Sequence, residues 1–207
     1  MSLHADAVRT LTAWSPGNQQ QESLRHAFLA FLAARPDACE RSCVPGHLTA
    51  SMVLLDATGE HVLLTLHPRV GRWLQLGGHC ERRDGSLTRA AQREGAEESG
   101  IDGVTVDPNP LHLAVHPITC SLGVPTRHLD VRYLGVAPAG AEPAISAESV
   151  DLAWWPVTAL PPESCALDDL EAQVELAVRR LGKAGVAVGS AEALAPVASR
   201  RSGAAGG

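Results

Sequence analysis

The chain has 207 residues, and its 17 basic and 23 acidic side chains give it a formal net charge of −6. Hydrophobic residues make up 45% of the sequence, which suits a globular protein and excludes wholesale disorder. The acidic balance argues against a nucleic-acid polymer as partner, because proteins that bind one present a basic face. No stretch approaches the roughly 20 apolar residues of a membrane span, and the N-terminus lacks the apolar core of a signal peptide. We therefore expect a cytoplasmic protein without a membrane partner.

The first 46 residues predict a helical hairpin outside the main domain. Apolar residues recur at helical spacing from Leu3 to Trp14 and again within residues 19–34, and a Ser-Pro-Gly sequence separates the two runs. Pro36 ends the second run. We expect the main domain to span residues 47–182, followed by an Ala/Gly-rich tail over residues 183–207 that packs weakly.

Strand and helix patterns alternate within the main domain. Residues 48–56 and 61–66 are two strand-like runs around a turn at Gly59, which is typical of a β-hairpin. The further predicted elements are a strand at 73–76, a helix at 86–99, strands at 104–106, 111–116, 128–137 and 152–156, and a final helix at 167–181. Gly100 stands where a glycine often ends a helix. The order predicts an α/β fold.

Five scattered cysteines in a chain without an export signal do not indicate a disulfide framework. Cys39, Cys43 and His47 have a spacing compatible with zinc. However, Pro45 and Gly46 would break a helix between them, and no second pair of ligands follows at zinc-finger spacing. Two small buried thiols are the favoured interpretation, and metal binding by these three residues stays open.

Three carboxylates on the predicted helix 86–99 are the strongest indication of a functional site. Glu94, Glu97 and Glu98 stand at positions i, i+3 and i+4, so they share one face and repel one another. Arg93 alone cannot compensate three charges, whereas a divalent cation can, and oxygen ligands favour Mg²⁺, Mn²⁺ or Ca²⁺. The alternative is an acidic helix face that water solvates.

The segment from Gly78 to Ile101 resembles the Nudix box, G-x5-E-x7-R-E-U-x-E-E-x-G-U, in which U is a bulky apolar residue. The second half matches as the run that begins at Arg93 and ends at Ile101. Asp84 replaces the first Glu of the pattern, and one extra residue separates it from Arg93. We expect the loop before the helix to absorb this insertion. Gly95 fills an apolar position and predicts close packing against a neighbouring strand or loop.

This resemblance implies a Nudix-like α/β/α sandwich with a mixed β-sheet, covering about residues 47–181. It also implies the hydrolysis of a diphosphate linkage in a nucleoside diphosphate derivative, with Mg²⁺ or Mn²⁺ as cofactor. The cation would neutralise phosphate charge and lower the pKa of bound water.

The resemblance assigns roles to the matching residues. The implied metal ligands are Glu94, Glu97, Glu98 and the carbonyl of Gly78. The implied catalytic residues are Glu94, Glu98 and Arg93, with Arg93 holding a carboxylate in place rather than touching substrate. Instead of binding the metal, Glu94 could act as the general base; in some members of the family the base lies on a later loop, where Glu148 is the alternative candidate.

Few residues in the sequence indicate which substrate the protein binds. His116, His128 and Arg132 follow the box and are candidate substrate-binding residues, although each is also compatible with a structural role. Pro117 lies sixteen residues after Ile101, a spacing that in the Nudix family hints at ADP-ribose-type substrates. The adjacent Trp154 and Trp155 would point to opposite faces of a strand, so at most one can stack on a base.

Two other functions stay open. One is a Nudix module that senses a nucleotide without turnover, because the first half of the box is altered. The other is an enzyme like isopentenyl diphosphate isomerase, for which Cys80 beside the box would be the candidate acid. The N-terminal hairpin could also support a homodimer.

Overall fold

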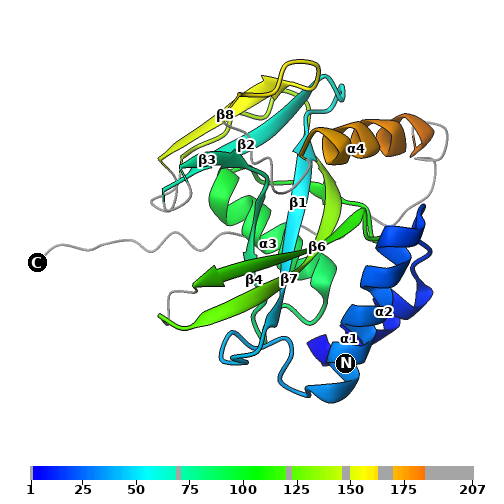
Figure 1. The fold of residues 1–207 in the computed structure, drawn as a ribbon. Coiled ribbons are helices and arrows are strands. Elements are labelled where there is room, and N and C mark those ends of the chain that lie inside the picture. The colour runs from blue at the N-terminus through cyan, green and yellow to red at the C-terminus, as the bar shows by residue number, and fades with distance from the viewer. Residues whose placement is uncertain (1, 69–70, 120–122, 146–149, 163–169, 185–207) are drawn as a thin grey trace, which may run out of the picture.

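The computed structural model describes residues 2–68, 71–119, 123–145, 150–162 and 170–184 (Figure 1). Its helices are α1 (Leu3–Ala13), α2 (Gln19–Ala34), α3 (Leu87–Ser99) and α4 (Leu170–Ala184). Its strands are β1 (His47–Leu55), β2 (His61–His67), β3 (Arg72–Leu74), β4 (Leu76–His79), β5 (Thr105–Val106), β6 (His112–Thr119), β7 (Pro125–Val136) and β8 (Asp151–Pro156). Among these described residues, no helix is both long enough and apolar enough to cross a bilayer.

The sheet is mixed, as predicted, and β1 runs through its centre (Figure 1). β1 lies parallel to β7 along its whole length. On its other side β1 pairs antiparallel with β4 over residues 49–52 and with β2 at residues 54–55. The predicted hairpin of residues 48–56 and 61–66 is therefore confirmed. The single strand predicted at 73–76 is wrong, because the chain changes partner at Gln75: β3 pairs with β2, and β4 pairs with β1.

The two faces of β1 are covered by different helices. Met52 and Leu54 point to the face that α3 covers, whereas Val53 and Leu55 pack with residues of α4. A Cβ atom on Gly95 of α3 would lie 2.5 Å from Cε of the fully buried Met52. A side chain at this position would force the buried end of Met52 to move, which confirms the close packing expected of Gly95. The result is an α/β/α sandwich.

The N-terminal hairpin is helical, as predicted, and it packs against the main domain. Leu11 and Phe28 are buried in the same apolar cluster as Met52 of β1. The Gln21 side chain accepts a hydrogen bond from the backbone N–H of Leu113 at 2.7 Å and donates one to the carbonyl of Leu113 at 2.9 Å. These two bonds fix α2 beside β6. The predicted tail beyond residue 184 lies outside the described residues.

Candidate active site

The helix that carries the box carboxylates begins and ends at local signals. The Ser86 hydroxyl accepts a hydrogen bond from the backbone N–H of Arg89 and caps α3 at its N-terminus. Gly100 has φ +67° and ends the helix in the left-handed conformation that favours glycine. The helix is continuous from Leu87 to Ser99, so the carboxylate triplet keeps its helical spacing.

Arg93 connects the loop, the strand and the helix of the site through hydrogen bonds. Its buried guanidinium donates from Nε to Oδ1 of Asp84 at 2.8 Å, and from Nη2 to Oδ2 of Asp84 at 3.2 Å. Nη1 donates to Glu94 at 2.9 Å and to Glu97 at 2.8 Å. Nη2 also donates to the carbonyl of His79 at 2.8 Å. Burial opposes the charge, but the hydrogen bonds that Arg93 donates to Asp84 and the charge of Glu94 raise the pKa of Arg93 above its ordinary value. Arg93 therefore stays a cation that fixes the loop, the strand and the helix together.

The backbone of Gly77 and Gly78 meets the carboxylates of Glu94 and Glu98. The Gly77 N–H donates to Oε2 of Glu98 at 2.8 Å, and Gly77 has φ +148°, which favours glycine. A Cβ atom on Gly78 would lie only 2.6 Å from Oε2 of Glu94. The two glycines thus let the backbone of β4 approach both side chains, whereas Glu97 lies farther out, with 52% of its side chain exposed.

The box carboxylates contact Arg93 and the glycine backbone, and they do not form a compact group of three ligand atoms. Over the described ranges, the one group of three His, Cys, Asp or Glu ligand atoms that all lie within 4.8 Å of one another consists of histidines, not of the box residues. Glu94 and Glu97 instead share Nη1 of Arg93. For a cation to bind all three carboxylates, the Glu side chains would have to rotate toward it.

A buried polar network occupies the opposite face of β1 and contains two of the predicted substrate-binding residues. The fully buried Arg132 donates from Nε to Asp130 at 2.8 Å, and its Nη2 lies 2.8 Å from Nε2 of His116. The further members are Gln173, which contacts Nη1 of Arg132, and Thr49 and Ser51, which donate to Asp130. Although burial raises it, the pKa of Asp130 is lowered overall by the charge of Arg132. A structural ion pair is the role this geometry supports for Arg132.

His128, the third predicted substrate-binding residue, lies beside His47 and His79. Burial lowers the pKa of His79 to about 3, with a smaller effect from the charge of His128. Burial likewise lowers the pKa of His128 to about 4, with the charge of His47 acting in the same direction and that of Asp130 against it. The pKa of His47 is also lowered by burial. The three rings are therefore neutral near pH 7.

These histidines make the fold sensitive to acid. Their pKa values are lower in the folded state than the value of about 6.5 in an unfolded chain, so between about pH 6.5 and pH 4 the unfolded state binds more protons. The free energy of unfolding should therefore fall as the pH falls through this window, by up to about 1.4 kcal/mol per pH unit for each ring, less where solvent screens it. Urea unfolding at pH 7.5 and pH 5.0, with a chelator present, measures the change. Equal or higher stability at pH 5.0 would show that the rings are charged in the folded protein.

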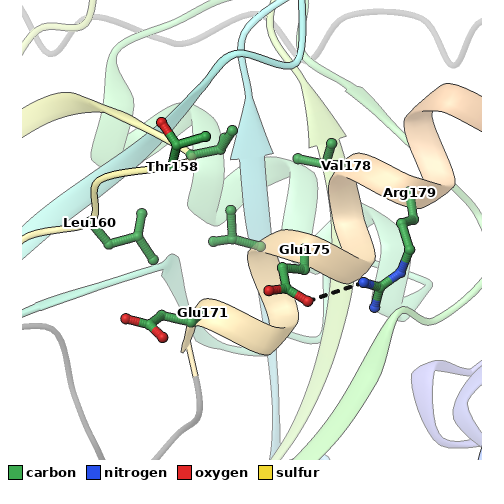
Figure 2. A pocket seen from close by; sticks show the side chains of 8 residues that line it. Thr158, Leu160, Glu171, Glu175, Val178 and Arg179 are labelled. Atoms are coloured by element: carbon green, nitrogen blue, oxygen red, sulfur yellow. Dashed lines mark hydrogen bonds and ion pairs between the residues drawn. The ribbon is translucent and has the colours of Figure 1, made fainter.

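The adjacent tryptophans of β8 lie on opposite faces of the sheet, and the groove beside α4 lies away from the box. Trp155 contacts Trp73 edge-on, with ring centroids 5.4 Å apart, whereas Trp154 packs against the cluster on the other face, which confirms that the adjacent tryptophans point apart. Figure 2 shows a groove between α4 and the segment after β8, with an ion pair of 3.1 Å between Glu175 and Arg179. No box residue lines this groove.

Sequence reasoning missed the role of Asp84, which the altered box left unassigned and which the structure pairs with Arg93 through two hydrogen bonds. It also missed the pairing of Arg132 with Asp130, although their i, i+2 spacing on one strand places both on the same face.

Glu148 lies outside the described residues. Cys39 and Cys43 are buried free thiols, and neither joins His47 in the three-ligand group described above.

Comparison with known proteins identifies the fold and the family. The family model described as NUDIX domain matches residues 45–175. A hydrolase of the NUDIX family from Clostridium perfringens has 24% identity and a TM-score of 0.50, covering 66% of this chain and 97% of its own. An Ap4A hydrolase from C. elegans has 17% identity and a TM-score of 0.51, covering 66% and 98%. A MutT protein from Methanosarcina mazei Go1 has 19% identity and a TM-score of 0.50, covering 66% and 96%.

A search of curated proteins found no match. The solved structures, at these identities, show that the fold is shared. The family model spans more than half of the chain and includes the whole box from Gly78 to Ile101, and on this evidence the chain belongs to the Nudix family.

Proposed function

We propose that the protein hydrolyses a diphosphate linkage in a nucleoside diphosphate derivative, with Mg²⁺ or Mn²⁺ as cofactor. The observation that carries the proposal is the convergence of Glu94 and Glu98 on the Gly77–Gly78 backbone, with Arg93 bracing the neighbouring carboxylates. An acidic face that water merely solvates would need neither a buried arginine nor two glycines in contact with it.

The donor set fits a hard divalent cation. Glu94, Glu97, Glu98 and the Gly78 carbonyl offer only oxygen atoms, which Mg²⁺ and Mn²⁺ prefer. The Glu94 carboxylate lies so close to Gly78 that a Cβ there would be 2.6 Å from Oε2, which brings this carboxylate against the backbone of β4. When bound, the cation would neutralise phosphate charge and make a water molecule more acidic.

The chain's own residues would divide the remaining work. Glu98 would be oriented by the hydrogen bond that it accepts from the Gly77 N–H. Glu94, only 13% exposed, is positioned to accept the proton of the attacking water. Arg93 would fix the positions of Glu94 and Glu97 through the hydrogen bonds from its Nη1 atom. This role does not require contact with the substrate. Glu148 is the alternative base.

For the substrate class we propose nucleoside diphosphate derivatives, with ADP-ribose as the first to test. Pro117, whose position after the box suggests this class, lies exposed on β6 opposite Arg127 of β7. Ap4A is the second compound to test, because the C. elegans relative is named for it.

The experiment is a screen of the full chain with Mg²⁺ or Mn²⁺ against ADP-ribose, Ap4A, NADH and nucleoside triphosphates, with products separated by ion-exchange chromatography. We expect metal-dependent cleavage of at least one diphosphate compound and no cleavage with a chelator. Cleavage that continues unchanged in the chelator, or no cleavage of any compound by folded protein, would contradict the proposal.

The same screen separates the alternatives. A compound that raises the melting temperature but is not cleaved would favour a sensing module. An isomerase would convert isopentenyl diphosphate without releasing phosphate products. Against the isomerase, Cys80 is buried and burial raises the pKa of its thiol well above the ordinary value, which makes it a poor proton donor near pH 7.

A further inference from the structure

Three histidines from three neighbouring strands meet on one face of the sheet. His47 of β1 is the direct neighbour of His128 in the parallel β1–β7 pair. His79 of β4 stands opposite Thr49, two residues along β1 from His47 and hence on the same face. The ring centroids form a nearly equilateral triangle, with separations of 5.1 Å (47–79), 5.0 Å (47–128) and 4.9 Å (79–128). One nitrogen of each ring lies within 4.8 Å of the other two.

This triangle has the dimensions of a three-histidine metal site. With Zn–N bonds of about 2.0–2.1 Å and tetrahedral angles, three imidazole rings bound to one ion have centroids about 5 Å apart. The bound nitrogens would then be about 3.3 Å from one another. The rings already stand at the right separation, so small rotations of the side chains bring the nitrogens to the ion.

The hydrogen bonding of the ring nitrogens is also that of a metal site. His47 is 1% exposed, and its Nδ1 lies 3.3 Å from the carbonyl oxygen of Cys43. A hydrogen bond from Nδ1–H leaves the lone pair on Nε2, which is how metal-binding histidines are commonly oriented. The Nε2 atoms of His47 and His128 are both buried, and neither has a hydrogen-bond partner among the described residues. Buried polar atoms without partners are rare and call for a ligand or an ion.

We propose that His47, His79 and His128 form a transition-metal site, separate from the box carboxylates, which binds Zn²⁺. Imidazole nitrogens suit Zn²⁺ and the neighbouring divalent ions Co²⁺, Ni²⁺ and Cu²⁺, whereas Mg²⁺ prefers oxygen. Three protein ligands leave a fourth position for water or another small ligand. The site does not depend on the proposed hydrolase activity.

The charged residues near His47, His79 and His128 have opposite effects on a bound cation. The exposed guanidinium of Arg41 acts unfavourably on a cation at all three rings, whereas the buried carboxylate of Asp130 acts favourably at His128. The site also has a structural consequence, because the carbonyl of His79 accepts a hydrogen bond from Arg93. An ion there would tie β1 and β7 to the strand that carries the box glycines.

The test is a titration of the metal-free full chain with Co²⁺, followed by X-ray absorption of the Zn²⁺-loaded protein. We expect one equivalent of Co²⁺ per chain with the visible absorption of a four- or five-coordinate ion, and a zinc shell at about 2.0–2.1 Å with scattering from three imidazoles. Binding below one equivalent, or a shell made only of oxygen, would overturn the proposal. This measurement uses the unaltered protein, so it decides the question even if a variant fails to fold.

Matched variants locate the site. His128→Gln and His79→Gln should weaken Co²⁺ binding at least about 100-fold. His26→Gln, which alters an exposed histidine of α2, and Glu98→Gln, which alters the box, should leave it unchanged. Unchanged binding in folded His128→Gln, or loss in Glu98→Gln, would place the metal elsewhere.

Discussion

Glu98→Gln should lower metal-dependent hydrolysis by roughly 10³-fold, which corresponds to about 4 kcal/mol of lost transition-state stabilisation. The amide keeps the shape of the side chain and an oxygen that can accept the hydrogen bond from the Gly77 N–H. It loses the negative charge that a hard cation requires. The fold should therefore be retained, and turnover with saturating Mg²⁺ measures the loss.

Glu175→Gln is the matched control for this variant. Glu175 lies on α4, is 67% exposed and pairs only at the surface with Arg179, so its neutralisation should leave turnover unchanged. Equal melting temperatures of the two variants would show that the difference is chemical. A folded Glu98→Gln variant with normal turnover would remove Glu98 from the mechanism.

Arg93→Leu should be the most destabilising single change at the site, by about 3–5 kcal/mol. The substitution leaves the carboxylates of Asp84 and Glu94 without their cation, and these side chains are only 3% and 13% exposed. Because domains are stable by only about 5–15 kcal/mol, a large share of the folded population could be lost. Urea unfolding monitored by tryptophan fluorescence measures the change.

Two further variants test the reason for this loss. Arg179→Leu removes an exposed arginine of α4 and should change the stability by less than about 0.5 kcal/mol. Arg93→Lys keeps the charge but lacks the planar fork that reaches Asp84, Glu94 and the His79 carbonyl together, so its stability should fall between those of Arg93→Leu and the parent. An Arg93→Leu protein as stable as the parent would show that the carboxylates of Asp84 and Glu94 do not need a cationic partner in the folded protein.

Local signals made most of the fold predictable. The boundaries of α3 follow from Ser86 and Gly100, whose roles depend only on neighbouring backbone atoms. The β1–β2 hairpin follows from two apolar runs around one turn. The change of partner at Gln75 could not be predicted, because which strand accepts β4 is decided by the register across β1 and not by the sequence of residues 73–79.

The site was predictable to a smaller extent. The spacing of Glu94, Glu97 and Glu98 placed them on one helix face, but it did not show that Arg93 would contact both Glu94 and Glu97. Arg132 illustrates a second limit, since its position in a strand does not tell which face is buried or that Gln173 of α4 would meet it. The three histidines come together only through the pairing of three strands, so no local pattern could indicate them.

Manganese binding to the box tests the central claim most directly. Electron paramagnetic resonance of the full chain, titrated with Mn²⁺ in the presence of a non-hydrolysable diphosphate analogue, should show at least one bound ion with oxygen ligands, lost in Glu98→Gln. Mn²⁺ binding that is the same in Glu98→Gln, or a bound ion whose spectrum shows histidine nitrogen instead of carboxylate oxygen, would contradict the assignment of the box as the catalytic metal site.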